Sequence, residues 1–320
     1  MNRQLWYGFF AFIGVVIIGF FVLLMVIISP EKSKDSQMAA AHPVVQPKAE
    51  APPRSTADVV DKKYKKYMPP SIHDVPGGPE GEKIKQGYKY MTETASTLDG
   101  YVGNKLSCVN CHANGGTGPA LDLIGITKVY PKYNSRADKI ITIEDRVNGC
   151  FRRSMNGKPL EKDSPVMDAM VAYLDYISSN VPEETKERPW GELQKVKGDI
   201  TKVNVDNGRE IFQKACISCH GENGDGNRYG LAVFGENSYN IGAGMARLRT
   251  AAAFIQNYMP LVANGGYEPG SLTEQEAIDV AAYINGQPRP DFADKIYDWP
   301  KGDAPDDAAY ETLAQKKKKE

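Results

Sequence analysis

The chain is 320 residues long, with 41% apolar residues and a formal net charge of −1. This composition is ordinary for a globular protein, and the length allows two domains with separate cores. The near-zero charge gives no indication of a nucleic-acid partner, so none is expected.

The first predicted element is an apolar run at Leu5–Ser29, which holds no charged residue and is long enough to cross a bilayer as one helix. A cleaved signal peptide has a shorter apolar core of about 7 to 15 residues, with small residues close behind it. Here the only cluster of small residues, Ala39–Ala41, lies well downstream. We therefore expect an uncleaved transmembrane anchor over residues 5–29.

A flexible linker is predicted for residues 30–80. The composition shifts there to Pro, Ala, Lys and Ser, with few large apolar residues. Its lysine-rich end would suit an acidic partner or lipid headgroups, but a solvated linker is the simpler interpretation.

Two short motifs contain four of the five cysteines: Cys108-Val-Asn-Cys111-His112 and Cys216-Ile-Ser-Cys219-His220. The pattern is typical of c-type haem attachment, in which two thiols bond the haem and the histidine ligates its iron. A lone CxxC would also suit zinc or a redox site, but two copies, each followed by histidine, favour two covalently bound haems c. Because covalent haem attachment takes place outside the cytoplasm, we expect a single-pass protein of the inner (cytoplasmic) membrane with its haem domains in the periplasm.

Helical patterns flank both motifs and predict two tandem class I cytochrome c domains. Apolar residues recur at helical spacing before each motif (Ile84, Tyr88 and Met91; Ile211, Phe212 and Ala215) and in an amphipathic segment after it (Met170, Leu174 and Ile177; Ile278, Ala281 and Ile284). The distance from Cys108 to Tyr173 is 65 residues, and that from Cys216 to Tyr283 is 67. The predicted fold is all-α, with one domain over residues 81–195, a second over residues 205–290, and a polar surface tail over residues 291–320.

The second axial ligand of each haem is a separate question, because it distinguishes an electron carrier from a catalyst. Outside the motifs the only histidines are His42 and His73, in or near the linker, and His73 is the only serious candidate. In the second copy Met259 lies in a Tyr-Met-Pro sequence, 43 residues after Cys216, and is favoured over Met245, because a methionine on an apolar surface is more often packing than ligand.

The same spacing applied to the first copy leads to the fifth cysteine, since Cys150 lies 42 residues after Cys108. An inert buried cysteine is the alternative, and Met155 is a second candidate ligand in this loop. Three nearby arginines would favour the thiolate over the thiol: Arg146, Arg152 and Arg153. A thiolate ligand lowers the reduction potential of a haem, whereas methionine raises it.

The string from Arg146 to Gly157, Arg-Val-Asn-Gly-Cys-Phe-Arg-Arg-Ser-Met-Asn-Gly, completes a recognisable set with the two haem motifs and the Tyr-Met-Pro loop. Over roughly residues 88–287 the sequence resembles the dihaem thiosulfate dehydrogenase family. The resemblance implies that two thiosulfates are joined oxidatively into tetrathionate and that two electrons leave through the haems, with some members favouring the reverse reduction.

The resemblance also implies roles for individual residues. Cys150 would be the distal ligand of the active-site haem, opposite His112, and a transient attachment point for the substrate's sulfur. Arg146, Ser154 and Arg136 would line the substrate pocket, where positive charge offsets the repulsion between two dianions. The second haem would transfer electrons onward, with His220 and Met259 as its ligands, because Tyr258 stands where some members have a competing lysine.

Two other functions compete with this enzyme. A dihaem electron carrier would have no need of a thiolate or an arginine-rich pocket, and a dihaem peroxidase would need an openable iron, which Cys150 does not explain. The expected partners are thiosulfate and tetrathionate, a c-type cytochrome or other redox partner, and the membrane through the N-terminal helix.

Overall fold

The computed structural model describes residues 67–319. The predicted anchor at residues 5–29, and the predicted linker up to residue 66, lie outside the described residues. Within residues 67–319, none of the helices has the length and apolar character needed to span a membrane.

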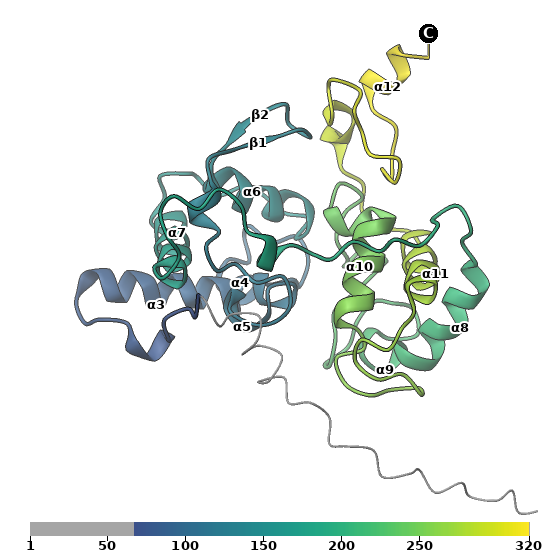
Figure 1. The fold of residues 1–320 in the computed structure, drawn as a ribbon, viewed down its shortest axis with the longest axis horizontal. Coiled ribbons are helices and arrows are strands. Elements are labelled where there is room, and N and C mark those ends of the chain that lie inside the picture. Colours follow the sequence, from purple (N-terminus) through teal and green to yellow (C-terminus); the bar gives the residue numbers. More distant parts are fainter. Residues whose placement is uncertain (1–66, 320) are drawn as a thin grey trace, which may run out of the picture. The chain divides into compact units, whose positions relative to one another are not determined.

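The N-terminal half of the described chain is a group of helices joined by long loops (Figure 1). Its elements are η1 (Ile72–Asp74), α3 (Pro79–Thr92), α4 (Thr94–Thr97), η2 (Cys108–Asn110), α5 (Ala113–Gly116), η3 (Thr127–Val129), α6 (Ile143–Arg153) and α7 (Pro165–Ser178). Helix α3 packs against α7. The approach is close because Gly87 has no side chain, and a Cβ placed there would lie 1.9 Å from the Ala169 carbonyl oxygen.

A second helical group follows the connecting segment, which contains η4 (Pro189–Gly191). Its elements are α8 (Val205–Ala215), α9 (Ile217–His220), η5 (Gly244–Ala246), α10 (Leu248–Tyr258) and α11 (Glu274–Asn285). Helix α11 packs against both α8 and α10. A Cβ on Gly208 of α8 would lie 2.0 Å from the Asp279 carbonyl oxygen of α11, so this crossing repeats the one between α3 and α7.

The apolar faces predicted from the sequence are buried. Met170, Leu174 and Ile177 of α7 are at most 2% exposed. Thr273 and Glu276 form a capping box at the start of α11, where each side chain satisfies a backbone N–H of the first turn.

Helices are not the whole fold, because two short strands, β1 (Lys132–Asn134) and β2 (Lys139–Ile141), form an antiparallel hairpin just before α6. The all-α prediction therefore holds except for this hairpin, whose strands are only three residues each and too short to show an alternating pattern.

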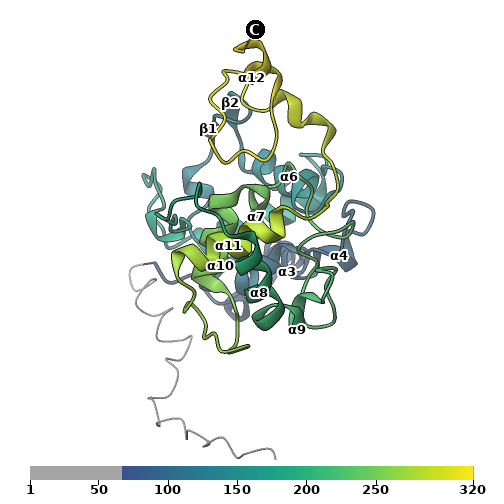
Figure 2. The same ribbon diagram turned by 90° about the vertical axis from the view of Figure 1, so that its right-hand side faces the viewer.

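Residues 291–319 are polar in composition, as expected, but they are not a free surface tail. This segment contains η6 (Ala293–Tyr297) and α12 (Leu313–Lys317). Trp299 is 3% exposed, and its backbone N–H donates to the Arg136 carbonyl in the turn between β1 and β2 at 2.9 Å. The C-terminal segment, drawn in yellow, accordingly lies beside the tip of the hairpin (Figures 1 and 2).

The two main hydrophobic clusters meet at the segment before α10. Tyr239, Ala243 and Ala246 are buried in the cluster built mainly from α3 and α7. Met245 packs against both that cluster and the one formed by α8, α10 and α11. A loop that follows the second motif thus completes the core of the first helical group.

Candidate active site

Each motif histidine is oriented by a backbone carbonyl. His112 Nδ1 lies 2.6 Å from the Leu121 carbonyl oxygen, and His220 Nδ1 lies 2.7 Å from that of Leu231. A hydrogen bond of this kind fixes the ring and leaves Nε2 as the nitrogen with a free lone pair. Both histidines are therefore set up as metal ligands with the usual supporting hydrogen bond.

The motif cysteines form no disulfide within residues 67–319. Burial raises the pKa of Cys108 and of Cys216 to about 12, and that of Cys111 to about 11. The thiols therefore lie in largely apolar surroundings.

A cavity of about 210 Å³ brings the first motif and α6 together. It is lined by His112, Cys108, Cys150 and Arg146 together with apolar side chains that include Met91, Leu123, Ile126, Ile143, Val147, Phe151, Met170 and Leu174. His112 and Cys150 lie close enough for the ring and the thiol to interact. The cavity therefore has a potential metal ligand on each of two separate elements and a largely apolar wall.

Cys150 is placed by α6, a helix that begins with a capping box between Thr142 and Asp145. Arg146, one turn earlier on the same helix, points its Nη1 at Cys150 Sγ, 2.9 Å away. Burial opposes ionisation of the Cys150 thiol, but the Arg146 charge and the His112 ring outweigh it and lower the pKa to about 6. The fifth cysteine is therefore a thiolate at neutral pH.

Two further residues beside this thiolate were not identified from the sequence. The Tyr130 hydroxyl hydrogen-bonds the Arg146 guanidinium. Arg188 lines the same cavity and is held by the Ile124 and Asp122 carbonyl oxygens, each 2.7 Å away. Tyr130 and Arg188 belong to a loop and to the connecting segment, where no periodic pattern indicates a contact.

Arg136 and Ser154 are not among the residues that line this cavity. The Arg136 guanidinium lies 4.6 Å above the Trp299 ring, and its Nη1 donates to the Gly242 carbonyl at 2.8 Å. Ser154 follows the last residue of α6, and its carbonyl accepts a bond from Asn104. Their assignment to the substrate pocket stays a prediction.

The candidate methionines differ in their surroundings. Met259 directly follows α10 and packs at the edge of the second hydrophobic cluster. Met245 packs between the two clusters, and Met155 is 3% exposed in the first one. Packing therefore accounts for the presence of Met245 and of Met155.

Two buried guanidinium nitrogens bear on whether the protein could hold a haem. Arg247 Nε and Arg289 Nη1 are buried and have no hydrogen-bond partner in the part of the chain that the structure describes. A buried N–H without an acceptor is costly, and the carboxylates that a haem carries would supply acceptors for these two nitrogens. Together with the oriented histidines and the motif cysteines, these two donors fit a haem group.

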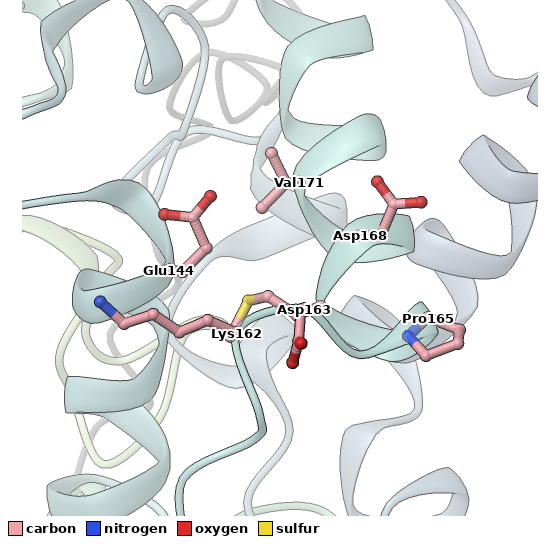
Figure 3. Close-up of a pocket in the computed structure, with 7 residues that line it drawn as sticks. Glu144, Lys162, Asp163, Pro165, Asp168 and Val171 are labelled. Carbon is pink, nitrogen blue, oxygen red and sulfur yellow. The ribbon is translucent and has the colours of Figure 1, made fainter.

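A larger hollow of about 380 Å³ lies elsewhere, between the N-terminal parts of α6 and α7 (Figure 3). It is lined by Glu144, Lys162, Asp163, Pro165, Met167, Asp168 and Val171. Asp168 is paired with Lys83, and no predicted site residue reaches the hollow. The chemistry points to the smaller cavity around Cys150.

Comparison with known proteins agrees with the two-domain reading of the sequence. Residues 100–182 match the family described as SoxA/TsdA, cytochrome c domain, and residues 205–288 match the cytochrome c family. The described residues thus contain two cytochrome c domains, which implies c-type haem.

Similar proteins cover most of the chain. A thiosulfate dehydrogenase from Psychrobacter arcticus is 41% identical over 246 residues, which is 74% of this chain and 73% of the relative. One from Allochromatium vinosum is 35% identical, over 72% of this chain and 86% of the relative. The solved thiosulfate dehydrogenase TsdBA from Marichromatium purpuratum has a TM-score of 0.66 and 31% identity, and the match covers 72% of this chain and 51% of that one.

Proposed function

Because this chain belongs to the thiosulfate dehydrogenase family, we propose that it joins two thiosulfates through a new S–S bond into tetrathionate. Two covalently bound haems would accept the two electrons released, and they would supply two electrons for the reverse reduction. The resemblance found in the sequence is confirmed at the level of the family.

The observation that carries this proposal is the 2.9 Å contact between Arg146 Nη1 and Cys150 Sγ inside the cavity that His112 also lines. Arg146 keeps Cys150 ionised and adds positive charge where a dianion must approach. The Tyr130 hydroxyl, bonded to Arg146, supplies a neutral donor beside it. The rest of the cavity wall is largely apolar.

The residues that would hold the two haems follow from the motifs and the cavity. Cys108 and Cys111 would attach the first haem, and His112 and Cys150 would hold its iron. Cys216 and Cys219 would attach the second, with His220 and Met259 as ligands. When bound, the haem irons supply the electron-accepting centres. In addition, the resemblance assigns Arg136 and Ser154 to substrate binding.

The electrons need an exit, and a c-type cytochrome or similar redox protein is the partner we propose. One relative of known structure, named TsdBA, is matched over about half of its length. The apolar run at residues 5–29 supports anchoring in the cytoplasmic membrane with the haem domains in the periplasm. If the full-length protein is released into the soluble fraction when membranes are washed with salt, the anchor is contradicted.

The test of the activity compares wild type with Cys150→Ala and uses Arg152→Met as the matched control. Arg152 lies two residues from Cys150, but its guanidinium pairs with Asp294 on the surface. Thiosulfate-dependent reduction of an artificial acceptor, and tetrathionate-dependent oxidation of a reduced dye, should be lost in Cys150→Ala and retained in the control. If wild type with both haems bound shows no turnover in either direction, the chain is an electron carrier instead.

A further inference from the structure

We propose that Asn240, which follows the second motif in the chain, is a positioning residue for the site on α6. It closes the C-terminal end of that helix and so holds Cys150 and Arg146 in place. The inference rests on the proposed function only in taking Cys150 as the ligand of the first haem.

The last carbonyl groups of an α-helix such as α6 have no partners within the helix. The backbone N–H groups of two following residues satisfy those nearest Cys150: Met155 N donates to the Cys150 carbonyl at 2.9 Å, and Gly157 N donates to that of Phe151 at 2.8 Å. The Arg153 carbonyl accepts a longer bond, of 3.4 Å, from Asn156 N, while the carbonyls of Arg152 and Ser154 take their partners from elsewhere in the chain.

Asn240 donates to two of these carbonyls, as the outside partner of Arg152 and as the shorter of two bonds to Arg153. Its side-chain Nδ2 donates to the Arg152 carbonyl at 2.8 Å, and its backbone N–H donates to the Arg153 carbonyl at 3.2 Å. The carbonyl of Ser154 accepts from Asn104 Nδ2 at 3.0 Å, and the same Nδ2 donates to the Ser238 carbonyl at 3.1 Å. The end of the helix is therefore capped by side-chain amides and by the segment 238–242.

The Asn240 side chain has no freedom to turn away. It is 1% exposed, and its Nδ2 also donates to Asn156 Oδ1 at 3.1 Å. Its Oδ1 accepts from the Gly242 backbone N–H at 3.1 Å. Because both ends of the amide are satisfied, an exchange of its oxygen and nitrogen would break bonds on each side.

The Gly242 carbonyl adds to the attachment of this segment to α6. The Gly242 carbonyl accepts a bond from Arg153 Nη1 at 3.1 Å as well as the one from Arg136. The segment 240–242 thus contacts α6 through the backbone and through a side chain of the last turn. Cys150 lies in this last turn, so a displacement of the helix end would move its sulfur relative to His112.

The experiment uses the full-length, haem-loaded protein with Asn240→Ala and, as a matched control, Asn207→Ala. Asn207 donates through its side chain to Asp279 at 2.9 Å, within the second helical group and away from α6. The readouts are the optical and EPR spectra and midpoint potential of each haem, hydrogen exchange of the amides at residues 154–157, and kcat/KM for thiosulfate.

In Asn240→Ala we expect the spectrum and potential of the first haem to change. Those of the second haem should stay as in wild type, even though Asn240 follows the second motif in the sequence. Exchange at residues 154–157 should accelerate, and kcat/KM should fall about tenfold, since the Arg152 carbonyl loses the Asn240 amide and the site loses its geometry. Asn207→Ala should leave the first haem and α6 unchanged.

A milder variant covers the case in which Asn240→Ala does not load haem. Asn156→Gly removes one acceptor of Asn240, and glycine suits the backbone there, where φ is 48°. It should shift the spectrum and potential of the first haem in the same direction, by a smaller amount.

The proposal is overturned if the spectrum and potential of the first haem and the hydrogen exchange all stay unchanged in Asn240→Ala, or if both haems change equally. If the wild-type protein is inactive with thiosulfate, the proposed function is refuted. The role of Asn240 would then be decided by the haem spectra and the hydrogen exchange.

Discussion

Single residues decide the chemistry of the cavity. Cys150 alone would be an inert buried thiol, because burial opposes its ionisation. Arg146 reverses this by placing a guanidinium 2.9 Å from the sulfur, and the Tyr130 hydroxyl hydrogen-bonds that guanidinium. The sequence indicates Arg146 as one of three arginines that favour the thiolate, and α6 brings it to Cys150 because residues four apart share a helix face. Tyr130 could not be predicted, because it comes from a loop.

Arg146→Met tests the role of that charge. The substitution keeps a long unbranched side chain but removes the cation, so a dianionic substrate should bind poorly. We expect kcat/KM for thiosulfate to fall about a hundredfold, mainly through KM. Steady-state kinetics with an artificial acceptor measures this. Arg152→Met, which alters a surface ion pair, should be close to wild type. An unchanged KM in Arg146→Met would mean that Arg146 does not meet the substrate.

At the level of elements, both helical groups use the same contact. Each has an early helix crossing a late one at a glycine, α3 on α7 at Gly87 and α8 on α11 at Gly208. In both cases the glycine faces a backbone carbonyl rather than a flexible side chain. The backbone cannot yield easily there, so an added methyl group must push the helices apart.

Gly208→Ala should therefore destabilise the protein by about 2 kcal/mol, because its Cβ would meet the Asp279 carbonyl. Gly149→Ala is the matched control, since Gly149 lies within α6 and its Cβ would meet nothing within 4 Å. That control should gain about 0.5 kcal/mol from the better helix propensity of alanine. The midpoint of thermal unfolding measures both. If both variants shift the unfolding midpoint by a similar amount, the close crossing of α8 and α11 is not the cause of the destabilisation.

Much of this level could be predicted from the sequence. Apolar spacing identified the buried faces of α7 and α11, and Thr273 with Glu276 marked the start of α11. The hairpin of β1 and β2 could not be predicted, because its strands have only three residues and Ile140 is 69% exposed. Periodicity carries information only where an element is long and one face is buried.

At the level of the whole described chain, the C-terminal segment connects elements that are far apart in sequence. Asp298 accepts two bonds of 2.8 Å from Arg153 of α6, and it lies 3.8 Å from Arg136 in the hairpin turn. These contacts span more than a hundred residues, so no local pattern predicts them. The polar composition suggested a surface tail, but here the polar groups are used in buried pairing.

Removal of that carboxylate is the last prediction. Asp298 is 7% exposed at its side chain, and Arg153 and Arg136 are 17% and 19% exposed, so solvent cannot replace it. Asp298→Ala should lower the free energy of unfolding by about 3 kcal/mol, because two cations are left in a partly dry site with no carboxylate. The midpoint of denaturant-induced unfolding of the haem-loaded protein measures the loss.

The control is Asp306→Ala, which removes a carboxylate from the same segment. Asp306 is 69% exposed and pairs with Arg249 at the surface, where screening leaves an ion pair with little net effect. Its midpoint should stay at the wild-type value. An equal midpoint for the two variants would mean that the C-terminal segment contributes nothing through Asp298. A loss confined to Asp298→Ala would instead identify its buried pairing with the arginines as what joins the segment to α6 and the hairpin.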